Sequence, residues 1–212
     1  REYFPIDPAK VKTVFSGVEH IVTEPAKPTS RPTVLYPAAT YPHKNHLTLI
    51  KAFEKVADTH SEIQLILTGG AGRAETEIIE LIKQSRHADR IERTGRVSSE
   101  ELEDQMKDST VVAFPSKYEG FGLPVLEAMA AGVPVIVGKG TPPEEILNNP
   151  EWTVEPEDVS GWAVAIERAV LDPNERFRAA KTAINRAAEY KWEHSAAQLE
   201  KVWRQLLARK IE

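Results

Sequence analysis

The chain has 212 residues, of which 41% are hydrophobic and 28% are charged, a composition typical of a globular protein that buries a sizeable core. Its formal net charge of −5 argues against a partner bound mainly through a phosphate backbone, so we expect no nucleic acid. Cysteine is absent. Disulfides, zinc-thiolate sites and thiol nucleophiles are therefore excluded, and the composition fits a reducing compartment.

The sequence offers no lead to a metal centre or a membrane span. Its histidines are scattered, and neither H-E-x-x-H nor a D-x-D pair, which could hold a nucleotide-bound cation, occurs. No apolar run reaches the roughly 18 to 20 residues that a membrane-spanning helix needs. The start, residues 1–5, does not resemble a signal peptide and has no initial Met, so we expect a fragment or a processed product.

Short apolar runs rich in β-branched residues alternate with longer amphipathic stretches along the chain. The runs predict strands at 11–17, 33–38, 63–70, 91–97, 111–116, 134–138 and, briefly, near Trp152. The amphipathic stretches predict helices at 46–57, 74–88, 100–109, 123–131, 159–171, 175–190 and 196–209. Three prolines within 25–32 indicate an exposed connection between the first two predicted strands.

Helix caps and two large side chains add detail to these elements. Asn45 can cap the helix that follows it. The residues suited to start the helix at 100–109 are Ser98 or Ser99, with Glu101 or Glu100 placed for a capping box. Trp192 and Trp203 lie at helical spacing among Ala and Leu, so we expect them to fix the C-terminal helices to the core.

Strands separated by helices of about 10 to 15 residues predict βαβ units, a parallel sheet and right-handed crossovers. We therefore expect an α/β fold, a Rossmann-like, doubly wound parallel sheet of about six strands, with helices on both faces and extra C-terminal helices. Ligands of such sheets bind outside the carboxyl ends of the strands, near the reversal in strand order. The loops that follow strands are thus the informative ones.

The loop after the strand at 63–70 contains glycines but no nucleotide-binding fingerprint. Gly70 and Gly72 lack the third Gly or Ala of the dinucleotide motif, and the loop follows an inner strand. We interpret these glycines as allowing a tight turn. The sequence also lacks the Walker motif and the G-x-S-x-G elbow, which argues against a P-loop phosphotransferase and a hydrolase of that type.

The segment after the strand at 111–116 carries the strongest signal. It consists of Glu119, Gly120, Phe121, Gly122, Leu123, Pro124 and, further on, Glu127. With "FPS" before it, this segment resembles the E-x7-E donor-binding motif of retaining glycosyltransferases of the GT-B fold, family 4. It keeps every fixed position of F-P-S-x-x-E-G-F-G-x-P-x-x-E-A-M-A-x-G-x-P-V-I. The resemblance extends over about 11–146 and includes "VKTVFSGVE" and "HKNHLTLIKAF".

Enzymes of the family that this chain resembles have two Rossmann-like domains that face each other across a cleft. The resemblance implies that this chain is the C-terminal, donor-binding half and that the N-terminal acceptor domain is absent from it. Residues 1–30 would form the tail of the interdomain linker and a first strand, 31–190 the nucleotide-sugar-binding domain, and 191–212 a C-terminal helix. We expect this chain alone to bind a donor weakly and to be inactive.

The helix that begins near Leu123 can bind an anion at its N-terminus. The first N–H groups of a helix have no partner within it, and the helix dipole makes that end positive. Gly120 and Gly122 allow the main chain to approach a ligand, and free N–H groups around Gly122 and Leu123 could receive a diphosphate. Phe121 lies in the same loop and is a further candidate donor-binding residue.

Two carboxylates flank this helix start, and a carboxylate can accept two hydrogen bonds from vicinal hydroxyls. The resemblance assigns Glu127 to the ribose of a nucleotide sugar and Glu119, as a catalytic residue, to the hydroxyls of the transferred sugar. Taken singly, Glu119 would be interpreted as a solvated loop acid and Glu127 as a favourable charge in a first helical turn. The glycines and the preceding strand favour the functional interpretation of the pair.

Lys44 is the second candidate catalytic residue, since an ammonium could neutralise charge on a departing diphosphate. The resemblance is weaker here, because the family commonly has an Arg five or six residues earlier, where this chain has Ala38 and Ala39. Arg73, Arg96 or a histidine beside Lys44 could substitute for it. The alternative interpretation of Lys44 is an exposed residue near a helix start.

The remaining candidates are proposed from position. Arg96 and Val97 fall where the family grips the nucleobase, largely through main-chain groups, and an ordinary loop role is an equally good interpretation. Thr40 and Gly70 are candidate donor-binding residues that would line the cleft.

The resemblance implies a hexosyltransferase that moves a sugar from a nucleotide diphosphate, such as a UDP- or GDP-sugar, to a hydroxyl acceptor, with retention. The acceptor would be a glycan, a lipid-linked sugar or a small molecule, as in polysaccharide biosynthesis. No cofactor or obligatory metal is implied. We expect a cytoplasmic protein, with peripheral contact at the inner face of the membrane left open.

Two alternatives remain. A nucleotide-sugar epimerase or a phosphorylase of the GT-B fold also uses a two-domain sugar site. A non-catalytic, Rossmann-like nucleotide-binding module of the flavodoxin type would instead have an acidic cluster after an early strand, where this chain has "YPHKN".

Overall fold

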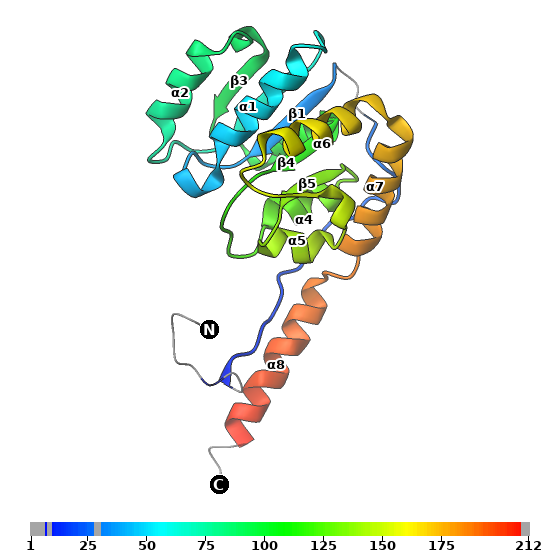
Figure 1. Ribbon diagram of the computed structural model, residues 1–212. Coiled ribbons are helices and arrows are strands. Elements are labelled where there is room, and N and C mark those ends of the chain that lie inside the picture. Colours follow the sequence, from blue (N-terminus) through cyan, green and yellow to red (C-terminus); the bar gives the residue numbers. More distant parts are fainter. Residues whose placement is uncertain (1–6, 8–9, 28–30, 209–212) are drawn as a thin grey trace.

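Six parallel strands form a single sheet in the computed structural model, which describes residues 7, 10–27 and 31–208 (Figure 1). The strands, in chain order, are β1 (Thr33–Pro37), β2 (Gln64–Thr68), β3 (Ile91–Gly95), β4 (Val111–Phe114), β5 (Val135–Gly138) and β6 (Thr153–Val154). Their order across the sheet is β3-β2-β1-β4-β5-β6. The predicted α/β fold with a doubly wound parallel sheet is confirmed.

Eight α-helices and three short 3-10 helices occur in the described part of the chain. The α-helices are α1 (His46–Ala57), α2 (Glu75–Gln84), α3 (Ser99–Asp108), α4 (Leu123–Ala130), α5 (Pro142–Leu147), α6 (Val159–Leu171), α7 (Pro173–Ala187) and α8 (Trp192–Ala208). The 3-10 helices are η2 (Pro42–Lys44), η3 (Ala88–Arg90) and η4 (Pro150–Trp152). The helix predicted at 74–88 therefore ends early, and the last one begins four residues before its predicted start at 196.

The central strands are apolar because helices cover both faces of the sheet. All residues of β1 and β4 are buried, and β1 pairs in parallel with β2 on one side and with β4 on the other. Helix α1 packs against α6 and α2, whereas α3 and α4 line a common pocket. The largest fully buried side chains include Trp152, Trp162, Phe53 and Phe114.

The order of strands reverses between β1 and β4, so the loops after these two strands lie side by side at the switch point, where doubly wound sheets have their binding crevice. The loop after β1 comprises residues 38–45, and the loop after β4 comprises residues 115–122. These two loops contain most of the candidate residues. The sheet topology thus brings together segments that lie far apart in the sequence.

Local capping signals had mixed outcomes. The capping box at α3 is confirmed, since the Ser98 hydroxyl accepts from Glu101 N–H and the Glu101 carboxylate accepts from Ser98 N–H. Asn45, however, does not cap α1 with its side chain, and it adopts a left-handed conformation with φ of 58°. Its amide is used for contacts to two other loops, which are described below.

The segment before β1 runs along the domain without forming a strand in its described residues, so the strand predicted at 11–17 is wrong. It forms single backbone bonds instead, from Val18 N–H to Tyr190 O and from Val22 N–H to Ala130 O, both 2.9 Å long. A lone segment of this kind lacks the continuous hydrogen-bond ladder that defines a strand. Figure 1 shows it passing beside α8, where Gly17 approaches the main chain of Trp192.

Helix α8 extends away from the sheet, and its apolar residues face solvent in this chain (Figure 1). Trp192 and Trp203 are 47% and 59% exposed, so the prediction that they fix the helix to the core is wrong. Leu199, Leu206 and Leu207 are also exposed and recur at helical spacing. The periodicity correctly indicated an amphipathic helix, but it could not show that no described part of this chain covers the apolar side.

Candidate active site

Lys44 and Glu119 form an ion pair at the crevice between the loops after β1 and β4. The Lys44 Nζ atom lies 2.6 Å from Glu119 Oε1, and only 18% and 9% of the two side chains are exposed. Lys44 ends η2, whereas Glu119 precedes the start of α4. The structure therefore brings together the two residues predicted to be catalytic, and each supplies the charge that its partner needs when shielded from water.

Tyr36 links the two loops that carry this ion pair. Its hydroxyl donates to Lys44 O at 2.6 Å and lies 3.0 Å from Ser116 Oγ. Because the side chain is fully buried, the pKa of Tyr36 is raised well above its usual value, and the hydroxyl stays protonated. A main-chain bond of 2.8 Å from Lys117 N–H to His43 O joins the same two loops directly.

Asn45 adds a third connection. Its side-chain amide donates to Pro115 O at 3.1 Å and to Pro156 O at 2.6 Å, and its Oδ1 atom accepts from the Thr48 hydroxyl at 2.9 Å. One buried side chain thus links the turn after β1 to the loop after β4 and to the segment before α6. These contacts explain why Asn45 is not available as a conventional cap.

The N-terminus of α4 lies directly after the Glu119 loop. Gly122 is the residue before the helix and has φ of +109°, a conformation that residues other than glycine rarely adopt. Leu123 and Pro124 form the first turn, and a Cβ at Gly120 would meet no atom within 4 Å. Pro124 has no N–H, and the N–H groups of Val125 and Leu126 donate to Gly122 O at 3.0 and 3.2 Å. The N–H of Leu123, together with the loop before it, is therefore the part of this helix start that can face an anion.

Phe121 occupies a different environment from its neighbours. Its ring lies 6.1 Å from the ring of Phe15 and 6.2 Å from that of Tyr190, centroid to centroid. Its side chain therefore packs between the segment before β1 and the end of α7. A contact between Phe121 and a donor would have to come from its main chain.

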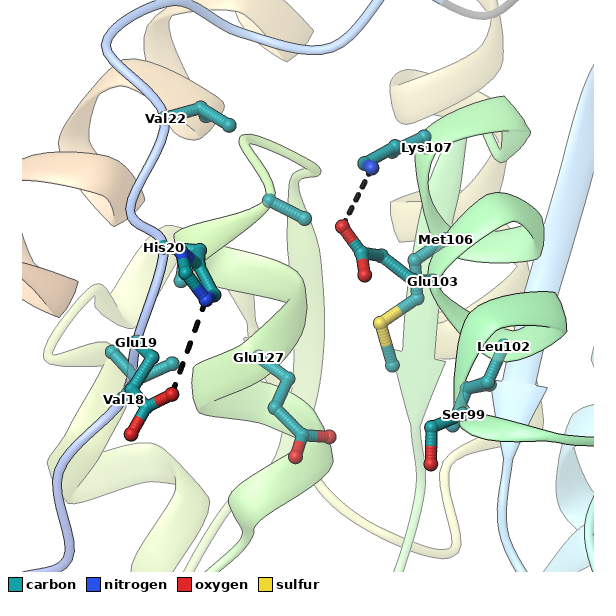
Figure 2. Close-up of a pocket in the computed structure, with 12 residues that line it drawn as sticks. Val18, Glu19, His20, Val22, Ser99, Leu102, Glu103, Met106, Lys107 and Glu127 are labelled. Atoms are coloured by element: carbon teal, nitrogen blue, oxygen red, sulfur yellow. Dashed lines mark ion pairs between the residues drawn. The ribbon is translucent and has the colours of Figure 1, made fainter.

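Glu127 borders a pocket of about 250 Å³ between the N-terminal segment, α3 and α4 (Figure 2). The apolar wall of this pocket includes Val18, Leu102 and Met106, and Ser99 adds a hydroxyl. The Glu127 carboxylate remains open to solvent, yet the surrounding protein removes part of its hydration and raises its pKa above the usual value. This carboxylate can accept hydrogen bonds from a ligand in the pocket.

Thr40 and Gly70 are neighbours, since Thr40 N–H donates to Gly70 O at 3.2 Å. Thr40 is fully buried, and its hydroxyl donates to Glu75 at 2.5 Å and accepts from Gly72 N–H at 2.8 Å. A ligand can reach its side chain only after the loop rearranges. Gly70, in contrast, has no atom within 4 Å of the position of a Cβ, so its outer side is open.

Among the cations considered as substitutes for the family Arg, Arg73 and Arg96 are exposed. Arg93, which the sequence did not single out, donates at 3.0 Å to Glu75, whose carboxylate also accepts from the Thr40 hydroxyl. Burial raises the pKa of Glu75, but hydrogen bonds from Thr40 and Arg93 outweigh it and bring the pKa below the usual value. Arg93 therefore already has an anionic partner.

Val97, predicted to lie near a nucleobase, lines a depression bordered by Thr94 and Gln105. Glu127 does not line that depression. The pocket beside Glu127 is lined by Ser99, at the start of α3, and not by Val97. The structure thus places Arg96 and Val97 near α3 but does not bring their side chains into the pocket of Glu127.

His46, in the first turn of α1, is buried. Neither of its ring nitrogens has a hydrogen-bond partner, and its ring lies 4.7 Å from that of Tyr36. Burial is the main cause that lowers the pKa of His46 to about 4. A neutral imidazole at this position cannot replace the missing Arg.

Tyr36, Ser116 and Arg93 were missed by the sequence analysis. A single Tyr in an otherwise aliphatic buried strand was the available signal, because a buried hydroxyl needs a partner. Within the ranges that the structure describes, no group of three or more His, Asp or Glu side chains could hold a metal ion. No helix of these same ranges is long and apolar enough to cross a bilayer.

A parallel sheet of order 3-2-1-4-5-6, with a Lys–Glu pair and a helix N-terminus at its switch point, defines a Rossmann-like domain. The chain belongs to the family described as glycosyl transferases group 1, whose model matches residues 18–186.

The chain is similar to O-antigen chain mannosyltransferase B of Escherichia coli, with 30% identity over 165 residues, which are 77% of this chain and 43% of that protein. It is 30% identical over 212 residues to the MMP alpha-(1->4)-mannosyltransferase of Mycolicibacterium hassiacum, covering 97% of this chain and 51% of that protein. The solved sucrose-phosphate synthase of Thermosynechococcus elongatus matches with a TM-score of 0.77 and 30% identity, over 86% of this chain and 47% of that one. The chain thus spans about half the length of these relatives, and its fold is one half of the GT-B fold.

Proposed function

We propose that this chain is the donor-binding half of a retaining hexosyltransferase that takes a nucleotide-diphosphate sugar as its donor. The observation that carries the proposal is the Lys44–Glu119 pair, 2.6 Å apart at the switch point and directly before the N-terminus of α4. This arrangement offers a cation and N–H groups to a diphosphate and a carboxylate to hydroxyl groups. Membership of the glycosyl transferases group 1 family supports the same conclusion.

Each charged side chain has a separate role in this proposal. Lys44 stabilises the negative charge that develops on the departing diphosphate. Glu119 accepts hydrogen bonds from hydroxyls of the transferred sugar, and Glu127 accepts them from the ribose. The carboxylates flank the diphosphate rather than contact it, so they do not compete with it for the N–H groups of α4.

The ion pair prepares the site before a donor arrives. An ammonium has three donors, so Lys44 can keep its bond to Glu119 while it donates to a phosphate oxygen. The Tyr36 hydroxyl holds the carbonyl of Lys44 in place at 2.6 Å. Little conformational freedom is then lost when the donor binds, which favours both affinity and rate.

The remaining parts of the donor are assigned by their neighbours. Main-chain groups of Gly120, Gly122 and Leu123 contact the diphosphate. The ribose lies at Glu127, and the base lies in the pocket of about 250 Å³ beside it, toward the start of α3 and the main chain of 96–97 that precedes this helix. Gly70 lines the far side of the crevice.

We propose that the reaction needs no cofactor or obligatory metal, because Lys44 and the α4 N–H groups supply the positive field at the leaving group. The acceptor is a hydroxyl of a glycan, a lipid-linked sugar or a small molecule, held mainly by the N-terminal half of the whole protein. That half is a partner of this chain and covers the exposed apolar side of α8 around Trp203. The whole protein acts in the cytoplasm.

The test is a screen of UDP- and GDP-sugars with the full-length protein, followed by Glu119→Ala and Glu127→Ala with the best donor. Both variants should lose transfer while their circular dichroism stays that of the parent. Glu127→Ala should also keep the parent's melting temperature, whereas Glu119→Ala leaves Lys44 without its partner and should lower it. Glu77→Ala, in the exposed part of α2, is the matched control. Unchanged transfer in both site variants would overturn the assignment. Formation of an epimer or a sugar phosphate instead of a transfer product would favour an epimerase or phosphorylase, and absence of nucleotide binding would favour a non-catalytic module.

A further inference from the structure

Three aromatic rings lie together at the mouth of the Lys44–Glu119 site. Tyr41 and His43 are stacked, with ring centroids 5.9 Å apart and an angle of 16° between the planes. The third ring is that of Tyr118, whose centroid lies 6.2 Å from that of His43 with an angle of 77° between the planes. We call this group, Tyr41, His43 and Tyr118, the aromatic rim.

The aromatic rim is exposed although large aromatic surface is normally buried. Tyr41 is 42% and Tyr118 69% exposed. His43 directly precedes Lys44, and Tyr118 directly precedes Glu119. The rim therefore adjoins, on each of the two loops, a side chain proposed to act in the transfer: Lys44 on the departing diphosphate and Glu119 on the transferred sugar.

The main chain holds the rim in place. Lys44 N–H donates to Tyr41 O at 2.9 Å, and Lys117 N–H donates to His43 O at 2.8 Å. The first bond closes the turn that carries Tyr41 and His43, and the second ties this turn to the strand end that carries Tyr118. A ligand would meet a prepared surface, not three independent side chains.

The chemistry of the rim selects one class of ligand. One face of a pyranose ring presents C–H groups that pack against an aromatic face, while its hydroxyls lie at the edge. Tyrosine and histidine offer such a face together with a polar atom at the ring edge. None of these three side chains is a Lys or Arg that would attract an anion, and an apolar protein helix would leave the phenol and imidazole atoms without partners.

We propose that the aromatic rim binds a sugar ring of the acceptor and holds it beside the reacting centre. The inference rests on the proposed function, since it takes Lys44 and Glu119 as the site of sugar transfer. The rim lies next to that site and outside the contacts assigned to the donor. A saccharide whose ring stacks here would have its hydroxyls directed toward the crevice.

The experiment uses the full-length protein and ligand-observed saturation-transfer NMR with methyl α-D-mannopyranoside and methyl α-D-glucopyranoside. Saturation should pass to the C–H protons of at least one glycoside in the parent protein. Tyr118→Ala and Tyr41→Ala should each weaken binding by about 2- to 10-fold, as expected for the loss of one ring contact. Tyr118→Phe should retain binding. Phe177→Ala removes an exposed aromatic side chain on α7 and serves as the matched control.

Kinetics separate this inference from the proposed function. With a working donor and acceptor, Tyr118→Ala and Tyr41→Ala should raise the acceptor KM and leave the donor Kd, measured by titration, within twofold of the parent. If the Tyr41→Ala/Tyr118→Ala double variant keeps both the donor Kd and the acceptor KM of the parent, the role proposed for the rim would be overturned, and the proposed function would not. If the parent protein binds no nucleotide but still binds glycosides at the rim, the proposed function alone would be overturned. Absence of glycoside binding to the parent would overturn the inference. So would a rim variant that weakens the contact between the two halves of the full-length protein but leaves the acceptor KM unchanged.

Discussion

Lys44 and Glu119 are separated by 75 positions in the sequence, yet Lys44 Nζ lies 2.6 Å from Glu119 Oε1. The contact arises because β1 and β4 are neighbours at the reversal of strand order, so their following loops leave the sheet side by side. Both side chains are mostly shielded from water, which makes each dependent on the other. The pair is therefore both a structural contact and the centre of the proposed chemistry.

Replacing Lys44 with Ala should lower kcat by about 100- to 1,000-fold, as for other groups that stabilise charge in a transition state. It should also lower the free energy of unfolding by about 1–3 kcal/mol, because the Glu119 carboxylate loses its charged partner. Steady-state kinetics and urea denaturation measure the two effects. Lys51→Ala, in an exposed position of α1, should change neither. A Lys44→Ala variant with the parent's kcat would contradict the assigned role.

The affinity for a donor should decrease with acidification because of Glu127. Partial desolvation raises the pKa of this carboxyl, so protonation begins at a higher pH than for an ordinary glutamate and removes an acceptor for the ribose. Titration calorimetry with the nucleotide diphosphate at several pH values measures the effect. Glu127→Gln should bind more weakly at neutral pH and show a flatter dependence on pH.

The same group has a predictable influence on stability. Since the folded pKa of Glu127 is raised, the folded protein binds this proton more readily than the unfolded chain does. Its contribution is most favourable below the unfolded pKa and is lost as the pH rises through the folded pKa. Glu127→Gln should therefore be no less stable than the parent at pH 7, and a clear loss of stability there would show that the carboxylate has a structural partner.

Gly122 and Gly120 form a matched pair for testing the loop. A side chain at Gly122 would have to adopt φ of +109° and would place its Cβ 2.7 Å from Pro143 Cγ. We expect Gly122→Ala to reduce the free energy of unfolding by about 1–3 kcal/mol, the usual range for such backbone strain. Gly120→Ala meets no atom within 4 Å and should change stability little. Equal denaturation midpoints for the two variants would argue against the strained turn.

His46 should make the fold sensitive to acid. Its pKa is lowered to about 4 by burial, whereas an unfolded His titrates near 6.5. Between these values the unfolded chain binds a proton that the folded protein does not, so stability falls as the pH falls through this window. The difference corresponds to roughly 3 kcal/mol. Urea denaturation between pH 7 and 4 should show a smaller loss for His46→Leu, and identical pH dependence in both proteins would exclude this origin.

Features that depend on neighbours along the chain could be predicted from the sequence. The apolar runs that became β1, β2, β4 and β5 and the amphipathic runs that became the helices express the strand and helix periods directly. The capping box of Ser98 and Glu101 joins residues three positions apart, so its signal is local. The loop from Glu119 to Glu127 was recognisable because its glycines and the helix start form one continuous segment.

Other features depended on residues that meet only in the folded chain. Asn45 has the sequence signature of a cap, but in the folded chain its side-chain amide donates to Pro115 O and Pro156 O instead. Trp192 and Trp203 show the pattern of a buried helix face, while their burial depends on whether a partner surface exists. The position of Tyr36 beneath Lys44 likewise follows from the neighbouring strands.

The sequence by itself thus determined the α/β class, the helix start after the glycine-containing loop, and which two carboxylates flank that start. Only the tertiary structure decided that Lys44 meets Glu119, that Thr40 is covered and that the ring of Phe121 packs away from the crevice. The physical reason is the range of the interactions. Periodicity and capping act within a few residues, whereas strand order and burial are settled by contacts across the whole sheet.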